Sequence, residues 1–435
     1  MRRIFLRAWG RYNMQATVQA GSPSAKPVSL TRNEWLVLVA AFLGWMFDGV
    51  EQGVFPLVAR PALQDLLGVE ADKLIGPWMG YITAAFLLGA AGGGLVFGWL
   101  GDRIGRVRAM IFSILAYSLF TGCCYFAQAA WQLGVFRFLA AIGMGGEWSL
   151  GVALVMECWP EKHRPMLAGA IGAASNVGFG LLGALGLVFE VSRGSWRWVM
   201  LAGAAPALLA LFIARWVPES ERWKNSVKET DSRPIREIFS GKLLRRTLLG
   251  LCFAAIVLIG TWGSVQWLPM WADQLTGGKV QHAKALAQLL IAVGAIIGCL
   301  VGPLVGGRFG RRPAYFLLCL CSLLSCAFLF RTVNQYGALF LFMMLLVGGS
   351  TAAFYGWFPL YLPELFPTRV RATGQGFCYN FGRILAAVGA IETGQLLKFY
   401  EGSYARAGAA ITLIYLLGMV LIWFGPETRG RPLPE

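Results

Sequence analysis

The stretch Gly98-Trp99-Leu100-Gly101-Asp102-Arg103-Ile104-Gly105-Arg106-Val107-Arg108 joins two long apolar segments of the chain. It packs glycines and fixed cations into a very short connection. A weaker copy occupies residues 303–312 and again joins two apolar segments. Short basic loops between membrane spans typically face the cytoplasm. The recurrence of this loop predicts that the chain is built from two related halves.

The composition excludes an ordinary soluble protein. Apolar residues make up 57% of the chain, charged residues only 14%, and the mean hydropathy is +0.60. Repeated apolar runs near twenty residues are typical of transmembrane helices, since lipid offers the backbone no hydrogen-bond partners. We therefore predict an all-α membrane protein with twelve transmembrane helices in two six-helix bundles. The expected spans are 34–57, 77–100, 108–127, 131–156, 166–189, 196–217, 247–271, 284–306, 313–331, 336–361, 373–397 and 405–424.

These spans divide the chain into five predicted segments. They are a basic cytoplasmic tail over 1–33, a bundle over 34–217, a cytoplasmic linker over 218–246, a bundle over 247–424 and a cytoplasmic tail over 425–435. Most of the 38 lysines and arginines fall on one side of the spans, which predicts that both termini are cytoplasmic. Translation from Met14 instead of Met1 stays an alternative. The net charge of the chain is +16. We expect these positive charges to face the lipid bilayer of the cell (inner) membrane, whose surface is negative, and not to bind nucleic acid.

A second repeated pattern supports the duplication. Glu157 and Arg164 follow the fourth expected span, and Glu364 and Arg371 follow the tenth at the same spacing. Small residues also crowd the second and fifth spans, where they let helices approach closely. Static packing accounts for most of them, and a sliding contact between the halves is a second interpretation for span two.

These motifs resemble the major facilitator superfamily over residues 30–430. The loop at 98–106 is similar to the family's signature between spans two and three, and residues 137–148 loosely match its span-four pattern. Residues 218–220 and 426–430 resemble sugar-porter signatures, and Gly145-Gly146-Glu147-Trp148 resembles metabolite:proton symporters. The run 48–51 resembles the acidic pair of aromatic-acid:proton symporters. One amide at Gln266 stands where sugar porters carry a polar cluster, which puts a hexose substrate in doubt.

The resemblance implies that the repeated loops hold the halves together in one access state. Asp102 is expected to accept from backbone amides at a helix start, and Arg103 and Arg106 to reach neighbouring helix carboxylates or C-terminal carbonyl groups. Gly307 stands where the first copy has Asp102, so we expect the second loop to bind more weakly. The residues of this predicted gate are Gly98, Asp102, Arg103, Gly105, Arg106, Arg308, Gly310, Arg311, Glu157, Arg164, Glu364 and Arg371.

Ionisable side chains inside a span cost several kcal/mol unless they are paired or wetted. Asp48 and Glu51 stand in span one, Arg137 and Glu147 in span four, and Arg383 in span eleven. With a rise of ~1.5 Å per residue, Glu51 and Arg137 come to similar depths, so an ion pair between them is possible. Arg383 falls near the membrane midplane with no acid at that depth in its own helix.

These charges predict the chemistry of transport. Asp48 is the first candidate for the proton carrier, Glu51 the second and Glu147 the third, with Arg137 as a partner. Arg383 is expected to bind a carboxylate in a bidentate manner, with a salt bridge to Asp48 or Glu147 as the alternative. Its predicted neighbours around the substrate are Asn380, Tyr379, Gln266, Asn176, Trp148 and Trp357.

We therefore predict proton-coupled symport of a small organic anion by alternating access. A sugar or polyol symporter is the main alternative, and an efflux antiporter or a non-transporting nutrient sensor are further ones. The sequence contains no nucleotide-binding loop, metal-ligand cluster or nucleophile elbow. We therefore expect no enzymatic activity, no cofactor and no bound metal. We expect a monomer whose partners are protons, the organic anion and the lipid bilayer.

Overall fold

The computed structural model describes residues 31–68, 71–189, 191–229, 233–277, 279–280, 282–401 and 403–435. The side chains of 71–73, 76, 186–187, 228–229 and 386–398 lie outside this description, as do residues 1–30 with the alternative start at Met14. Residues 33–435 form one compact unit.

The first half of this unit is entirely helical. Its elements are α2 (Arg32–Leu67), α3 (Ala71–Ile104), α4 (Arg106–Cys123), the 3₁₀ turn η3 (Cys124–Phe126), α5 (Ala130–Cys158), η4 (Glu161–His163), α6 (Arg164–Val188), α7 (Trp196–Ala202) and α8 (Ala207–Trp216). Two short helices follow within the predicted linker, α9 (Glu221–Glu229) and α10 (Pro234–Ile238).

The second half repeats this plan. Its elements are α11 (Gly241–Gly263), η5 (Val265–Trp267), α12 (Leu268–Thr276), α13 (Ala283–Phe309), α14 (Arg311–Thr332), α15 (Ala338–Leu365), η6 (Thr368–Val370), α16 (Arg371–Phe399), α17 (Tyr404–Ile411), α18 (Ile414–Leu421) and η7 (Ile422–Phe424). Helix α11 begins inside the predicted linker, and the boundaries of the five predicted segments stay predictions.

Among the described residues, 11 helical stretches are long and apolar enough to cross a membrane. Helix α16, with 29 residues, takes the place of the predicted eleventh span. The predicted all-α fold in two six-helix bundles is thus confirmed. Spans six, seven and twelve are each built from two consecutive helices. Span six breaks before Pro206, which lacks a backbone N–H, and span seven breaks at Ser264, whose hydroxyl bonds the carbonyl of Gly260 at 2.5 Å.

Two glycines set the turns of the repeated loops. Gly105 separates α3 from α4 with φ 110°, and Gly310 separates α13 from α14 with φ 104°. Only glycine adopts such angles without strain. One residue therefore suffices to reverse the chain between two long helices in each half.

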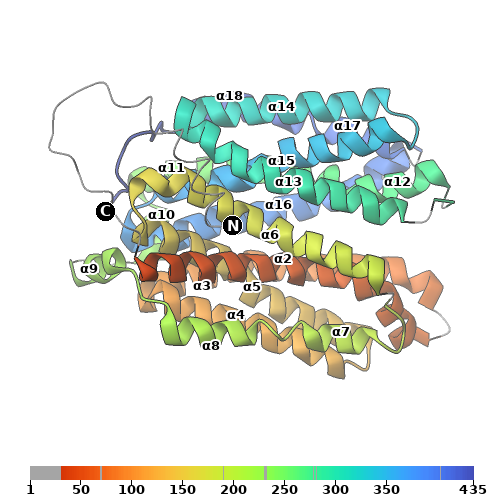
Figure 1. Ribbon diagram of the computed structural model, residues 1–435, viewed down its shortest axis with the longest axis horizontal. Coiled ribbons are helices and arrows are strands. Elements are labelled where there is room, and N and C mark those ends of the chain that lie inside the picture. The colour runs from red at the N-terminus through yellow and green to blue at the C-terminus, as the bar shows by residue number, and fades with distance from the viewer. Residues whose placement is uncertain are drawn as a thin grey trace. The chain divides into compact units, whose positions relative to one another are not determined.

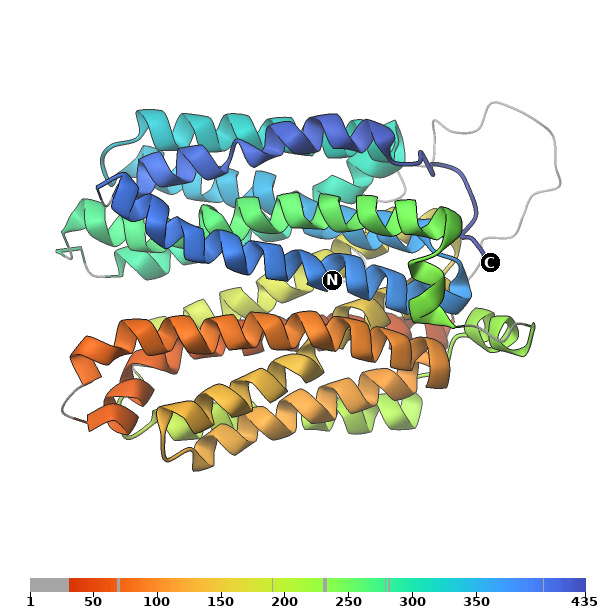
Figure 2. The same ribbon diagram turned by 180° about the vertical axis from the view of Figure 1, so that it is seen from behind.

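Both loops, α9, α10 and the end of the chain lie at the same end of the unit, which we call the latch end (Figure 1). The halves meet along two helix pairs, α3 with α16 and α6 with α13. Figure 2 shows α3 and α16 running side by side. Glycines permit this approach: a Cβ on Gly98 would lie 2.7 Å from the carbonyl oxygen of Ala372 in α16, and one on Gly169 would lie 3.1 Å from the carbonyl oxygen of Cys299 in α13. Helix α6 also contacts α15, where a Cβ on Gly172 would lie 2.6 Å from the Cα of Gly356.

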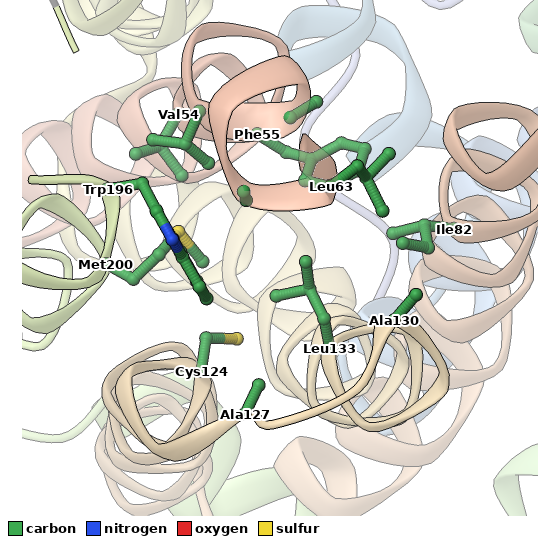
Figure 3. Close-up of a cluster of buried hydrophobic side chains, with 13 residues drawn as sticks. Val54, Phe55, Leu63, Ile82, Cys124, Ala127, Ala130, Leu133, Trp196 and Met200 are labelled. Atoms are coloured by element: carbon green, nitrogen blue, oxygen red, sulfur yellow. The ribbon is translucent and has the colours of Figure 1, made fainter. Parts of the chain in front are cut away.

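A cluster of buried side chains fixes the first half at the end opposite the latch. Trp196 is fully buried among Met200, Cys124 and Leu133 (Figure 3). Its indole N–H donates to Asp65 at 3.1 Å, so the ring packs in the core with its polar atom satisfied. This cluster ties α2, α3, α5 and α7 into one packed group.

Candidate functional site

A cavity of about 140 Å³ lies between the two halves. Helices α2 and α6 line it from the first half, and α11, η5, α13, α15 and α16 line it from the second. Its polar lining groups are Gln52, Ser175, Asn176, Thr261, Gln266, Gln288, Thr351, Tyr355, Tyr379 and Arg383. Aromatic and aliphatic side chains complete the wall, as in most small-molecule sites.

Arg383 gives the cavity its charge. The side chain is 3% exposed, and its guanidinium lies 5.2 Å from the centre of the Tyr379 ring. No carboxylate of the described residues lies within ion-pair distance of Arg383. Arg383 therefore forms no direct salt bridge with Asp48 or Glu147, which was the alternative interpretation. A buried cation that forms no direct ion pair with a described carboxylate attracts an anionic ligand.

An aromatic stack backs this wall. Tyr379 and Trp148 are stacked with ring centres 4.2 Å apart, and Trp45 lies within 6.3 Å of both rings. Trp45 and Tyr379 line the cavity, whereas Trp148 does not. Tyr379 covers the face of Trp148 in this conformation, and contact of Trp148 with substrate stays a prediction.

Asp48 and Glu147 are buried without partners. Asp48 is 0% exposed and Glu147 1% exposed, and none of their four carboxylate oxygens has a hydrogen-bond partner. Glu147 packs against Gly44 of α2, where a Cβ would collide with its carboxylate. Asp48 interacts electrostatically with Glu147 and with Arg383. The hydroxyl of Tyr117 also lacks a hydrogen-bond partner.

Glu51 and Arg137 form a buried ion pair. The guanidinium also donates to the Glu51 carbonyl at 3.1 Å. Thr121 donates to the same carboxylate at 2.8 Å, and the Arg137 guanidinium lies over Phe86 at 4.5 Å. Neither member of the pair lines the cavity. The ion pair between Glu51 and Arg137, which their similar depths in the membrane made possible, is thus present. It lies about one helical turn from Asp48.

Two further predicted substrate contacts lie elsewhere. Asn380 donates to the carbonyls of Gly145 and Gly376 at 2.9 and 3.1 Å, so it joins α16 to α5. Trp357 is fully buried against Tyr315 and Tyr361, with ring centres 4.8 and 4.6 Å away. Neither side chain lines the cavity in this conformation, and their contact with substrate stays a prediction.

Sequence reasoning also missed several lining residues. Gln52, Gln288, Thr261 and Tyr355 all border the cavity. Gln52 could have been predicted from the sequence, because it lies four positions after Asp48 and shares its helix face. Gln288 is an amide in an apolar run, which is the same signal that recommended Gln266.

At the latch end, Asp102 joins the two halves. It accepts from the backbone N–H groups of Ala372 and Thr373 at 3.2 and 2.8 Å, and from the Thr373 hydroxyl at 2.5 Å. These groups lie at the start of α16, so the contact is the one expected for an acid at a helix N-terminus. Arg106 pairs with Asp102 at 2.9 Å within the first half.

Glu157 carries the second link across the halves. Its carboxylate binds Arg106 at 3.1 Å and Arg371 of the second half at 2.8 Å. Arg106 also donates to the carbonyl of Thr368 at 2.6 Å. All four charged groups are at most 5% exposed, so this network works in a low dielectric. We call Asp102, Arg106, Glu157, Arg371 and Thr373 the first latch.

The second copy is organised differently. Arg311 binds Glu364 with two bonds of 2.9 and 2.5 Å, and the hydroxyl of Thr428 donates to the same carboxylate at 2.5 Å. These groups all belong to the second half. Arg164 of the first half pairs with Glu161 at 2.8 Å. We call Arg164, Gly307, Arg311 and Glu364 the second latch.

The remaining loop arginines contact aromatic rings. Arg103 lies 5.7 Å from the centre of the Trp99 ring, and Arg308 lies 5.7 Å from the centre of Phe309. Neither arginine forms an ion pair with a described carboxylate, and the gating role of both stays a prediction.

Two glutamates outside the spans cap the helices that follow the loops. Glu219 accepts from the backbone N–H of Val107 at 3.0 Å, and Glu427 accepts from Arg311 and Arg312 at 2.9 and 3.1 Å. Burial raises the pKa of Glu219 above its usual value of 4.5, against the pull of its backbone donors. Burial opposes ionisation of Glu427 too, but its backbone donors outweigh that effect and lower its pKa.

Two helical halves around a central, mostly apolar cavity define a membrane transporter of the two-repeat kind. The family model of the Major Facilitator Superfamily matches residues 35–390. The chain belongs to this superfamily of secondary transporters, and it is not an enzyme.

Relatives and solved structures agree with this assignment. The chain is 29% identical to a probable 4-methylmuconolactone transporter of Cupriavidus pinatubonensis, over 96% of this chain and 94% of the relative. It is 28% identical to a cis,cis-muconate transport protein of Acinetobacter baylyi, over 91% and 95%. A solved structure of the proton:xylose symporter XylE with 6-bromo-6-deoxy-D-glucose bound covers 92% of this chain and 98% of that one, with a TM-score of 0.77 and 17% identity. At this identity, the structure shows a shared fold.

Proposed function

We propose that the chain moves a small organic anion together with protons by alternating access. The supporting observation is Arg383, a buried cation at the cavity wall with no carboxylate partner among the described side chains. Amides and hydroxyls around it suit the polar groups of a small carboxylate. Two relatives named as transporters of methylmuconolactone and muconate support the same substrate class.

Asp48 is the proposed proton carrier, with Glu147 as its neighbour. An ionised carboxylate that is buried without hydrogen-bond donors costs several kcal/mol. Both groups are therefore proposed to carry protons while the latch end is closed. The Glu51 carboxylate is bonded to Arg137 and Thr121, unlike those of Asp48 and Glu147, so we assign this pair a supporting role in holding α2 against α5.

The proposed cycle follows from these positions. Cations concentrate at the latch end, which we infer faces the cytoplasm across a cell membrane. A proton and an anion enter from the opposite side, and the anion docks at Arg383. The proton neutralises Asp48 and the anion neutralises Arg383. The loaded carrier can then break the first latch and open inward, since less buried charge remains to be desolvated.

Uptake by Arg383 variants in proteoliposomes tests the anion site. Cis,cis-muconate, benzoate and xylose serve as probes. Arg383→Gln should weaken binding of the carboxylates by at least about 30-fold, because loss of a buried charge partner costs ~2 kcal/mol or more. Arg383→Lys keeps the charge but loses the bidentate geometry, and should recover part of the affinity. Equal uptake of all three probes by wild type and Arg383→Gln would contradict the proposal.

Asp48→Asn tests the proton site. We expect loss of uptake driven by a pH gradient with retained counterflow exchange, because exchange needs no net proton movement. Glu147→Gln is the matched comparison and should reduce driven uptake less. Normal accumulation of substrate by Asp48→Asn would remove this residue from the mechanism.

A sugar or polyol remains the second candidate. The observation that favours it is the set of amides at Gln52, Asn176, Gln266 and Gln288, which can bind hydroxyl groups. Under this alternative, Arg383→Gln leaves uptake of a neutral sugar nearly unchanged. The same variant series therefore separates the two substrate classes.

A further inference from the structure

A second groove lies at the latch end, apart from the transport cavity. It has a volume of about 580 Å³ and runs between the end of α3 and helix α10 of the linker. Trp99 and Arg103 border it on α3, and residues 233–240 border it on the other side. It shares no lining residue with the transport cavity.

Three arginines give this groove a strong positive charge. Arg103, Arg233 and Arg236 are exposed at its edge, and none of them forms an ion pair with a described carboxylate. The acid of α10, Glu237, instead binds Arg369 at 2.9 Å on the side of the second half. Three arginines around one opening are suited to a phosphate group, which guanidinium groups bind through several hydrogen bonds.

The groove also has an apolar part. Ile235 and Phe239 are each 41% exposed, and Trp99 lies beneath Arg103. The membrane span of α3 ends at Ile104, so this groove lies where the span meets water. Cations beside exposed apolar side chains at this depth match a phospholipid, whose phosphate and acyl chains need both. A free phosphate ion would use only the arginines.

The groove connects the two halves. Trp99 and Arg103 belong to the first half, next to Asp102 of the first latch. Helix α10 is fixed to the second half, through Glu237 with Arg369 and through Phe239 against Phe377, with ring centres 4.9 Å apart. A headgroup held by arginines from both sides would add a bond across the halves.

We propose that this groove binds the phosphate headgroup of an anionic phospholipid, and that the bound lipid favours the conformation with a closed latch end. The lipid then acts as a regulator of transport, separate from the substrate. The negative leaflet that attracts basic segments supplies this ligand at high local concentration.

Binding is tested on the full-length protein in nanodiscs. Phosphatidylglycerol is titrated into phosphatidylcholine, and retained lipid is measured by native mass spectrometry. Arg233→Gln/Arg236→Gln should weaken phosphatidylglycerol binding about tenfold or more, because each arginine near the headgroup contributes. Arg108→Gln/Arg215→Gln removes the same charge from exposed sites outside the groove and should leave binding unchanged. Equal weakening in both double variants would mean a general charge effect and would overturn the proposal.

Inorganic phosphate distinguishes the source of the ligand. Millimolar phosphate that stabilises the protein against heat as strongly as phosphatidylglycerol would point to a free anion and overturn the lipid assignment. Spin-label distances between the latch ends of α4 and α14 report the conformation. Phosphatidylglycerol should shorten them in the wild type and not in Arg233→Gln/Arg236→Gln. An equal shift in both proteins would show that the lipid acts elsewhere.

Discussion

The two latches descend from one repeated loop, yet only the first joins the halves by charged hydrogen bonds. Asp102 and Glu157 each bind groups of the second half. In the second latch, Glu364 is bonded to Arg311 and Thr428 of its own half. The same motif therefore fastens the halves together on one side and stabilises a single half on the other.

The difference has a local chemical cause. A Cβ on Gly307 would lie 3.0 Å from the ring of Pro165, at the place where Asp102 meets the start of α16 in the other copy. Proline has no N–H to offer a carboxylate. The next residue, Met166, lacks the hydroxyl that Thr373 supplies. The acid, one of the two amide donors and the hydroxyl are thus missing from the second latch.

Charge removal at the two equivalent glutamates is the strongest test of this comparison. Glu157→Gln should favour the open latch end by about 100-fold or more, because it leaves two buried arginines uncompensated at a cost of ~3–5 kcal/mol. Glu364→Gln should lower the thermal stability and leave the open–closed equilibrium nearly unchanged. Spin-label distances across the latch end and thermal melts measure the two effects. Similar opening in both variants would mean that the latches are equivalent after all.

Gly307→Asp tests whether the second latch can be restored. We expect a change of less than about 1 kcal/mol in the open–closed equilibrium, because the new acid would face Pro165 and not a pair of donors. Adding Met166→Thr supplies a hydroxyl and should shift the equilibrium further toward the closed state. A strong closure by Gly307→Asp alone, seen in the same distance measurement, would show that the missing acid was the sole difference.

The two capping glutamates should give the smallest effect, with opposite dependence on pH. The lowered pKa of Glu427 means that its stabilisation is present above pH 4.5 and is lost as the pH falls through its folded value. The raised pKa of Glu219 means that stability falls as the pH rises from 4.5 through its folded value. Thermal melts between pH 3.5 and 7 should show changes of about 1–2 °C with Glu427→Gln and Glu219→Gln. Parallel curves for both variants would contradict this assignment.

The fold can be predicted from the sequence because membrane spans and repeats are patterns within short stretches of the chain. The lengths of the apolar runs predict the helices. The rise per residue along a helix places Glu51 and Arg137 at similar depths, and the two residues form an ion pair. The repeated loop also located Asp102 at a helix start. These inferences need only distances along a helix.

The predicted substrate contacts that lie away from the cavity differ from the lining residues in rotation about a helix axis and in position along it. Tyr379 and Arg383 are four residues apart and share a face, which points into the cavity. Asn380 lies a third of a turn away and binds Gly145 instead. Trp148 has the correct depth but is covered by Tyr379, and Trp357 lies deeper toward the latch end. Such details depend on how the second half packs on the first, which no single span encodes.

The close approach of backbones along α3 and α6 has a consequence for temperature. Gly98 meets the backbone of Ala372, and Gly172 meets the backbone of Gly356. Glycine has no side chain, so few rotamers are lost when these surfaces come together. Closure there costs little side-chain conformational entropy. The heat of closing should then come mainly from the hydrogen bonds of the first latch. Warming is therefore expected to populate the open latch end, and a van't Hoff plot of spin-label populations would measure that enthalpy.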